Sequence, residues 1–491
     1  MSPAKKNALA SYGNFVALAV LGLFANPLLV GYLGPVAFGV WKACQRLLDV
    51  ATVADGRATQ ALKWVIAHRA GDTGVADKQR AVGAAMLIWL IWLPLLIVIQ
   101  IGILLLLPSL ISDVPASFMP TLYWAAGLLA LNVLITGIAN IPDSALVGSN
   151  MGYRSMIVTT TVTILANIVM VLLAWAGFGI PWLAATLVVT TLINGLVTLR
   201  VARRNIVWFG VKRPERQAVG SMARFSGWVL VWSLVTKFLL SSEIILIGAV
   251  LGAAVVTDFV FTSYILQFAL AICLMTASAM MPGLGKALGE KDMVRVNIVT
   301  QEARHLVFAI ATAVCCLILI FNGPFVRLWA GNEFFMGPLV NIAMALSFLQ
   351  LAMIRCDAQI QDTGLLIGGK VTLGIISTVL SLVLGYIFLT YSGEIWMMFA
   401  GLMLGRLPMS IGFLVMVGRM LNSPRYLSWK AILGAITFIL ISIGLAPHIP
   451  EGLIFVPLAL IGAITVSILC VYIMLSAATR AKLINRKSRA K

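Results

Sequence analysis

Long apolar runs are the feature that most restricts what this chain can fold into. Stretches such as 84–107 and 453–475 contain more than 20 consecutive residues without a charged side chain. About 20 apolar residues in a helix cross the hydrocarbon core of a bilayer, and only there can a chain leave such runs out of water. Strands of a membrane barrel would instead show short alternating runs. The runs therefore predict membrane-spanning helices.

Composition supports this interpretation for the whole chain. Of its 491 residues, 61% are hydrophobic and only 11% charged, and the mean hydropathy is +1.02. A water-soluble protein of this length could not bury so much apolar surface. We predict an all-α membrane protein with about 14 transmembrane helices, at 9–33, 36–62, 83–107, 120–147, 156–176, 182–200, 225–249, 258–282, 306–328, 338–360, 371–390, 396–417, 431–447 and 453–476.

The distribution of lysine and arginine predicts the orientation. With a cytoplasmic N-terminus, the inner segments hold 28 of the 35 cationic residues, and the outer loops hold only Arg327. This asymmetry predicts a multi-pass protein of the bacterial cytoplasmic membrane with both termini in the cytoplasm. The net charge of +18 is then a topology signal, so no nucleic-acid partner is expected. The basic tail, 480–491, is expected to rest on anionic membrane lipids.

A weak internal repeat divides the chain. Leu33-Gly34 and Leu251-Gly252 end two tight loops at an offset of 218 residues, and Asp143 and Asp357 lie near the inner ends of two corresponding spans. We predict two pseudo-symmetric six-helix lobes around a central cavity, at 1–205 and 206–420, as in many transporters. Two additional spans and the basic tail would occupy 421–491.

The N-terminal region carries motifs of a known family. These motifs are Tyr12-Gly13-Asn14, Asn26-Pro27-Leu28-Leu29, Tyr32-Leu33-Gly34-Pro35, Phe38-Gly39-Val40-Trp41 and Val53-Ala54-Asp55-Gly56. They resemble the opening of the polysaccharide transporter family of flippases, in the superfamily that also holds multidrug (MATE) exporters and the lipid II flippase. The family pattern usually has Asp-Leu-Gly where this chain has Asp55-Gly56.

The resemblance implies a function. Family members move polyprenyl-diphosphate-linked oligosaccharides, such as O-antigen or exopolysaccharide units, from the inner to the outer leaflet. A glycan polymerase or other export machinery would then be a partner.

A charged side chain inside a membrane span costs free energy, so each one needs a structural or functional explanation. With 100° per residue, seven side chains in or just after span 36–62 fall on one stripe, namely Lys42, Arg46, Asp49, Val53, Arg57, Gln60 and Trp64. Such a stripe predicts a hydrated cavity in which Lys42 and Arg46 attract a diphosphate group. The alternative is an ion-paired helix interface in which Arg46 or Lys42 pairs with Asp49. A structural role is the favoured prediction for Asp55.

Other spans contribute further candidates. Lys237 could add to an anion site or pair with Glu243, and Arg406 follows a Gly401-x-x-x-Gly405 pair that is typical of close helix packing. The predicted substrate-binding set is Lys42, Arg46, Arg57, Lys237, Arg406 and Asn14. Asp49 and Glu243 are candidates for coupling to a proton or a sodium ion. Asn14 and the Asn132 face of span 120–147 fit a sugar path, although hydrogen bonds between helices are their default role.

The sign of these charges separates the function classes. Cations outnumber carboxylates in the predicted cavity, which favours an anionic lipid-linked substrate over the cations of a multidrug exporter. A lipid II-type flippase is the second candidate and a MATE-like exporter the third. A membrane glycan polymerase or glycosyltransferase is disfavoured because the outer loops are short. The sequence indicates no catalytic residues, no cofactor and no metal site, and its six cysteines lack metal-ligand spacing.

Overall fold

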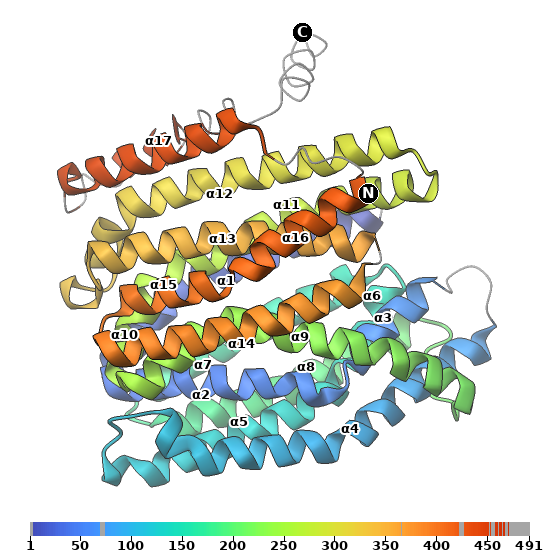
Figure 1. Cartoon of the computed structure of the whole chain (residues 1–491). Coiled ribbons are helices and arrows are strands. Elements are labelled where there is room, and N and C mark those ends of the chain that lie inside the picture. Colours follow the sequence, from blue (N-terminus) through green and yellow to red (C-terminus); the bar gives the residue numbers. More distant parts are fainter. Residues whose placement is uncertain are drawn as a thin grey trace. The chain divides into compact units, whose positions relative to one another are not determined.

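The structure is a computed structural model, and it is all-α in the residues that it describes (Figure 1). These residues are 3–68, 74–364, 366–421, 427–450 and, further on, 452, 457–459, 461–463, 465–466 and 470. Most of the predicted span 453–476 and the whole basic tail lie outside the described residues, as do Arg69 and Arg425.

Two compact units divide the chain at Thr257 and Asp258. In each unit the long helices run side by side (Figure 1). The first unit contains α1 (Pro3–Leu33), α2 (Pro35–Ala51), η1 (Thr52–Asp55), α3 (Ala58–His68), α4 (Val75–Leu110), η2 (Ala116–Phe118), α5 (Met119–Ala139), α6 (Ile141–Gly148), α7 (Gly152–Trp175), α8 (Ile180–Asn205), α9 (Arg216–Val250) and the start of α10 (Ala253–Thr262). The second contains the rest of α10, α11 (Tyr264–Gly289), α12 (Met293–Trp329), η3 (Asn332–Phe334), α13 (Pro338–Thr363), α14 (Ile367–Ser392), α15 (Ile395–Gly405), α16 (Leu407–Leu421), α17 (Trp429–Leu445) and η4 (Ala446–His448).

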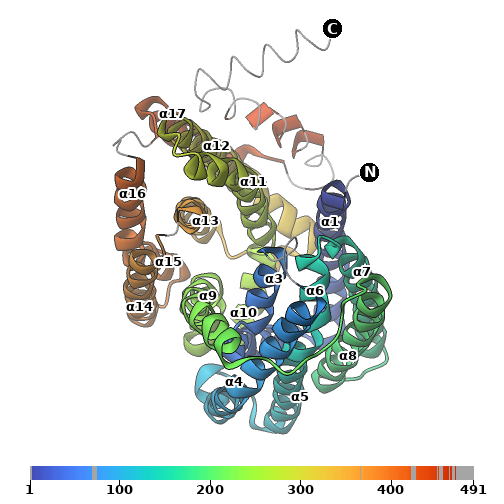
Figure 2. The same ribbon diagram turned by 90° about the vertical axis from the view of Figure 1, so that its right-hand side faces the viewer.

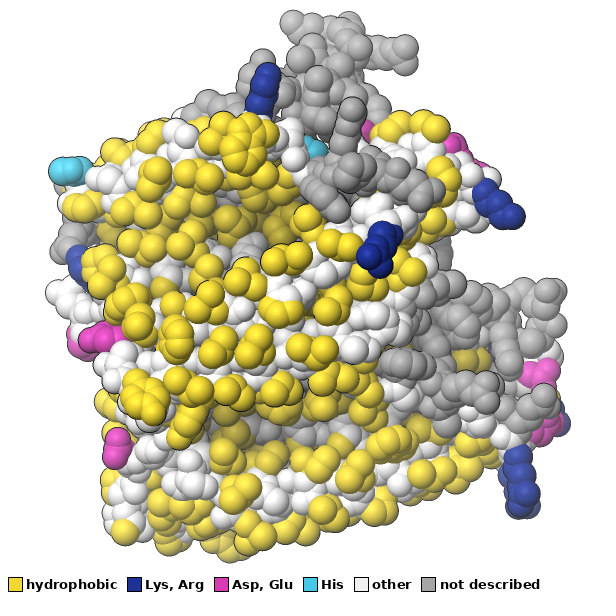
Figure 3. All heavy atoms as spheres, viewed as in Figure 1, with side chains coloured by type: hydrophobic (Ala, Val, Ile, Leu, Met, Phe, Trp, Pro, Cys, Tyr) yellow, Lys and Arg dark blue, Asp and Glu magenta, His cyan; other side chains and the backbone are white. Residues whose placement is uncertain are grey.

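Within the described residues, 12 helical segments are long and apolar enough to cross a membrane. They overlap 12 of the predicted spans, and the largest difference is at the start of α12, which begins at Met293 where the predicted span begins at 306. The protein is therefore a multi-pass, all-α membrane protein, as the apolar runs predict. The surface agrees, because in Figure 3 hydrophobic side chains cover the visible lengths of the helices and the charged ones sit near helix ends.

The predicted span 36–62 is not one continuous helix. The helix α2 ends at Ala51, η1 follows, and Gly56 and Arg57 both adopt positive φ, at 70° and 49°. A right-handed helix cannot continue through such residues, so α3 begins afresh at Ala58. The single stripe predicted along this span is therefore correct only as far as α2 reaches. The side chains beyond Ala51 have a different direction.

Backbone geometry reveals the internal repeat more sharply than the sequence does. Positive φ recurs at an offset of 218 residues, at Gly34 (81°) and Gly252 (90°) and again at Asp113 (58°) and Gly331 (125°). The helices α2 and α10 begin at the same offset, and so do α4 and α12. The predicted pseudo-symmetry is thus present in the order of elements and in the turns that join them.

The compact units do not coincide with the sequence repeats. The helix α9 begins the second repeat, but it packs against α2, α3 and α4 of the first unit. The lobe boundaries 1–205, 206–420 and 421–491 therefore stay a prediction.

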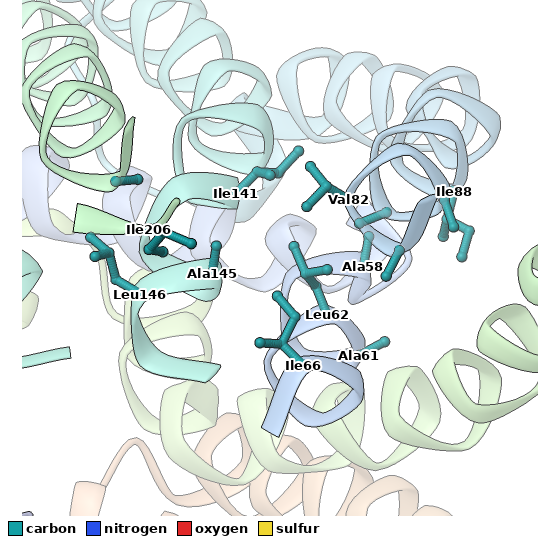
Figure 4. Packing of buried hydrophobic residues seen from close by; sticks show 14 residues of the cluster. Ala58, Ala61, Leu62, Ile66, Val82, Ile88, Ile141, Ala145, Leu146 and Ile206 are labelled. Carbon is teal, nitrogen blue, oxygen red and sulfur yellow. The ribbon is translucent and has the colours of Figure 1, made fainter. Parts of the chain in front are cut away.

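A buried cluster around α3 stabilises the first unit. Leu62 and Ile66 of α3 meet residues of α4 and α6, including Ile88 and Leu146 (Figures 2 and 4). Gly148 of α6 allows the close approach, since a Cβ there would lie 2.8 Å from the Ile66 Cβ atom. A salt bridge of 3.3 Å between Lys63 and Asp143 joins the same two helices. Asp143, predicted near an inner span end, thus has a structural partner.

The closest helix packing occurs between α14 and α15 in the second unit. A Cβ on Gly401 would lie 2.5 Å from the Leu384 carbonyl oxygen, and one on Gly405 would lie 2.2 Å from the Ser381 Cα atom. Both distances are too short for any side chain. The predicted packing role of the Gly401-x-x-x-Gly405 pair is confirmed.

We expect Gly401→Ala to lower the midpoint of thermal unfolding in detergent and to reduce the free energy of unfolding by about 1–3 kcal/mol. The reason is that the added methyl group must push two backbones apart. Gly102→Ala is the matched control, since nothing lies within 4 Å of that position in α4. The control should be neutral or slightly stabilising, because alanine favours a helix over glycine. An unchanged midpoint for Gly401→Ala would contradict the packing argument.

Candidate functional site

The helix α2 carries two cations on its less buried face. Trp41, Ala43, Cys44, Leu47 and Leu48 are buried, whereas Lys42 and Arg46 are half-buried. The Lys42 Nζ atom lies 5.1 Å from the centre of the Phe38 ring, one turn earlier. Lys42 and Arg46 are also close enough for their like charges to repel each other. This face of α2 therefore concentrates positive charge within the predicted span 36–62.

The only carboxylate of α2 is already engaged by another helix. The Lys237 Nζ atom of α9 lies 2.5 Å from the Asp49 Oδ2 atom. The pair is partly accessible, with 24% of the Lys237 side chain and 40% of the Asp49 side chain exposed. It joins α2 to α9, which begins the second sequence repeat.

This pair was not among the predicted pairings, which were Asp49 with Arg46 or Lys42 and Lys237 with Glu243. The sequence did not predict a bond between Asp49 and Lys237, which lie 188 residues apart. The sequence could not reveal this choice, because it depends on how α2 and α9 pack. Glu243 lies on α9 and is half-buried. With Lys42 and Arg46 besides Asp49, α2 carries more cationic than anionic side chains.

The break after α2 adds a third cation. The backbone N–H of Arg57 donates to the Asp55 Oδ1 atom at 2.8 Å, and the indole of Trp92 packs against Gly56. Asp55 therefore has the structural role that the sequence favoured. Arg57 is half-buried, and its Nε atom is buried without a hydrogen-bond partner among the described residues. A buried donor without an acceptor is costly, so an anion near it would be stabilised.

The C-terminal end of α9 is also bonded to the segment that follows α4. The Ser112 backbone N–H donates to the Gly248 carbonyl at 2.9 Å, and the Ser112 hydroxyl donates to the Ala249 carbonyl at 2.6 Å. Since Ser112 follows α4, these bonds join the ends of α4 and α9. The position of Lys237 opposite Asp49 is thus held by contacts one or more turns away.

A pseudo-symmetric contact joins the starts of α2 and α10. The Thr257 hydroxyl donates to the Pro35 carbonyl at 2.6 Å, and a Cβ on Gly39 would lie 1.7 Å from the Ala253 carbonyl oxygen. These four residues form two pairs at the repeat offset, Pro35 with Ala253 and Gly39 with Thr257. The contact is therefore reciprocal in the manner of a two-fold interface.

Asn14 belongs to α1, which carries none of these cations, and its side chain bonds a neighbouring helix. Its Oδ1 atom accepts a hydrogen bond of 2.7 Å from the Thr160 hydroxyl, which joins α1 to α7. In the same way, Asn132 of α5 accepts a bond of 2.6 Å from Thr191 of α8. Both asparagines have the helix-joining role that was their default prediction, and a role of Asn14 in substrate binding stays a prediction.

Arg406 occupies a buried position in the second unit. It is fully buried between α15 and α16, and its Nη1 atom donates to the Ser347 hydroxyl of α13 at 2.9 Å. Ser347 and Arg406 follow Asn132 and Thr191 by the same 215 residues. The Arg406–Ser347 bond thus repeats the helix contact of the first unit. Its substrate-binding role stays a prediction.

One buried ion pair was missed from the sequence. The Arg304 Nε atom of α12 lies 3.0 Å from the Asp357 Oδ1 atom of α13, and both side chains are at most 3% exposed. The sequence placed Arg304 in an inner loop before the span 306–328, whereas α12 begins at Met293. The aspartate near the inner end of α13 was the available signal, because a buried carboxylate needs a partner.

An apolar groove of about 360 Å³ also lies between α7 and α8. Its lining carries no charged side chain and consists of Val162, Leu165, Ala166, Val169, Leu173, Trp182, Ala185, Thr186, Val189, Thr190 and Ile193. It offers nothing to an anionic group. Among the described residues, no group of three or more His, Cys, Asp or Glu side chains could hold a metal ion.

Comparison with known sequences gives one family. Residues 86–336, slightly more than half of the chain, match the sequence model of a family described as polysaccharide biosynthesis protein. A comparison with curated proteins gave no match.

Comparison with solved structures gives one fold. The lipid II flippase MurJ, in an inward closed conformation, covers 97% of this chain and 99% of its own length, with a TM-score of 0.71 and 11% identity. A MOP superfamily transporter from Pyrococcus furiosus covers 86% and 96%, with a TM-score of 0.59 and 18% identity. A MATE protein in complex with MaL6 covers 86% and 97%, with a TM-score of 0.57 and 17% identity. The chain therefore has the fold of these transporters.

The Asp49–Lys237 pair can be tested with a double-mutant cycle of thermal stability. We expect Asp49→Ala and Lys237→Ala each to lower the unfolding midpoint, and the double variant to lower it by less than their sum. The coupling should be about 0.5–1 kcal/mol, because the partial exposure of Asp49 lets solvent screen the pair. The charge-reversed double variant D49K/K237D should recover part of the loss. Strictly additive effects would show that the two side chains do not interact.

Proposed function

The chain belongs to the polysaccharide biosynthesis protein family, and from this premise we propose that it is a flippase. It would translocate a polyprenyl-diphosphate-linked oligosaccharide from the inner to the outer leaflet of the bacterial cytoplasmic membrane, for export of a surface polysaccharide. Both termini would be cytoplasmic, as the distribution of lysine and arginine favours. A glycan polymerase or export machinery would receive the substrate on the outer side.

The positive charge near α2 is the observation that carries this proposal. Lys42, Arg46 and Arg57 place three cations on α2 and at the break that follows it, and the Asp49 carboxylate is occupied by Lys237. A diphosphate can neutralise several cations at once, and arginine can bind phosphate oxygens through two parallel hydrogen bonds. The buried Nε atom of Arg57 supplies a donor that such a group would satisfy.

Alternating access is the mechanism that we propose for this fold. The reciprocal contact of Pro35 and Gly39 with Ala253 and Thr257 lies at the predicted outer ends of α2 and α10. Its closure would leave the cationic region reachable from the inner side. Opening of this contact would then release the substrate outward. Asp49 and Glu243 remain our candidates for coupling to a proton or a sodium ion.

The alternatives share the fold but differ in substrate. A lipid II-type flippase would use the same cations, because its substrate also carries a polyprenyl diphosphate. A MATE-like exporter would need a carboxylate without a partner to bind cationic compounds. The engagement of Asp49 by Lys237 favours the two anionic substrates over the third alternative.

The proposal predicts a change in the leaflet distribution of lipid-linked saccharides. A strain lacking this protein should accumulate a complete repeat unit on the cytoplasmic side and lose surface glycan. Arg46→Ala should restore flipping at least about tenfold less well than the unaltered chain, because a charge-assisted bond of about 1.5–3 kcal/mol is lost. Arg46→Lys should restore part of the rate. The measurement is the fraction of extracted lipid-linked saccharide that an external glycan-modifying reagent reaches.

The matched control for Arg46→Ala is Arg200→Gln, which removes one exposed cation from α8. It should support normal flipping at equal protein level. Unchanged lipid-linked saccharides and surface glycan in the deletion strain would refute the proposed substrate. Accumulation of peptidoglycan precursor instead of a surface-glycan unit would favour the lipid II alternative.

The α2–α10 contact gives a second prediction. Gly39→Leu should prevent its closure, because even a Cβ would collide with the Ala253 carbonyl oxygen. We expect flipping to be lost, and a cysteine introduced at Val36 to react faster with an external, membrane-impermeant maleimide. Gly31→Leu, at a position with nothing within 4 Å, is the control and should change neither quantity. Equal labelling of Val36→Cys in both backgrounds would rule out this contact as a gate.

A further inference from the structure

The segment that connects the two sequence repeats has a composition unlike the spans around it. This basic linker, defined here as residues 203–216, runs from the end of α8 to the first residue of α9. It holds five cations, at Arg203, Arg204, Lys212, Arg213 and Arg216. Its single carboxylate, on Glu215, forms a salt bridge of 2.8 Å with Arg80 of α4. The linker therefore carries a surplus of positive charge.

The side of the basic linker that faces the protein is bonded to the first turns of α4. The Gln79 side-chain amide donates to the Trp208 carbonyl at 3.1 Å, and the Lys212 backbone N–H donates to the Gln79 carbonyl at 3.2 Å. A Cβ on Gly83 would lie 2.1 Å from the Lys212 carbonyl oxygen, so the two backbones touch. Trp208 and Phe209 pack against the buried cluster of α3, α4 and α6. The linker is thus held in one orientation.

The side of the basic linker that faces away from the protein combines exposed cations with exposed valines. The five cationic side chains are exposed, and within the described part of the chain none of them forms an ion pair. Val207 is exposed as fully as in an extended peptide, at 104%, and Val211 at 57%. Because Trp208 and Phe209 are turned inward, these valines are turned outward. In water, such a fixed apolar surface would be unfavourable.

We propose that the basic linker binds the anionic phospholipid headgroups of the membrane surface, with Val207 and Val211 inserted among them. The linker follows the end of α8 and contacts the start of α4, and both helices are long and apolar enough to cross a membrane, so lipid headgroups would be its nearest neighbours. Cations together with apolar side chains are the combination that binds to an anionic membrane surface. A nucleic acid or an acidic protein would use the cations and leave the valines in water.

The test uses the full-length protein reconstituted into vesicles. The six native cysteines are buried, so Val207→Cys can be labelled selectively with an environment-sensitive fluorophore. In vesicles of phosphatidylcholine with phosphatidylglycerol, we expect emission at shorter wavelength and protection from an aqueous quencher. In phosphatidylcholine alone the reporter should remain accessible. Added salt should reverse the effect of phosphatidylglycerol, since the attraction is screened within about 10 Å at 0.1 M.

Two charge variants distinguish specific binding from a general effect of net charge. R203Q/R204Q/K212Q/R213Q should raise the phosphatidylglycerol concentration needed for half of the fluorescence response at least about tenfold. The matched control, K286Q/K291Q/R295Q/K430Q, removes four exposed cations from the second unit and should keep the response. Equal responses in the two lipids, or equal losses in the two variants, would overturn the proposal. Neither outcome depends on flipping, so the proposed function is tested separately.

Discussion

The lack of hydrogen-bond partners in hydrocarbon is the constraint on which this structure depends. Backbone groups in the bilayer must bond within helices, so each apolar run becomes a helix. Where a helix is interrupted, side chains and turns must satisfy the freed groups. The break after α2 shows this, because Asp55 accepts the Arg57 backbone N–H and Gly56 takes the left-handed turn. The same break brings Arg57 into the cationic region, so the cost of the interruption and the proposed chemistry share one place.

Charge in this environment is controlled by pairing. The buried Arg304–Asp357 pair and the Lys63–Asp143 pair join neighbouring helices, and each leaves little net charge. The Asp49–Lys237 pair differs from the buried Arg304–Asp357 pair because it is partly exposed, and it stands beside two further cations of α2. A buried pair mainly avoids the penalty of a lone charge, whereas an accessible pair can exchange partners with a ligand. Exposure together with the additional cations of α2 therefore favours a substrate near α2, whereas the buried Arg304–Asp357 pair serves helix packing.

The internal repeat places corresponding turns and helix contacts in both halves of the chain. Turns with positive φ recur at Gly34 and Gly252, and helix contacts recur at Asn132–Thr191 and Ser347–Arg406. The repeated positions keep the geometry while the side chains differ. A fully buried arginine therefore stands where the first unit uses a threonine. Position within the repeat thus indicates a helix-joining role for Arg406 that its own span does not reveal.

The sequence by itself determined the class, the number and places of most spans, and the family resemblance, which the family match confirms. Hydrophobicity is a local property, so apolar runs and loop charges could be interpreted one segment at a time. The tertiary structure decided the break in the span 36–62, the partner of Asp49, the burial of Arg406 and the pairing of Arg304. These features depend on contacts between residues far apart in the chain, such as Asp49 and Lys237. A helical stripe predicts that a side chain has neighbours, but only the packing of helices selects which ones.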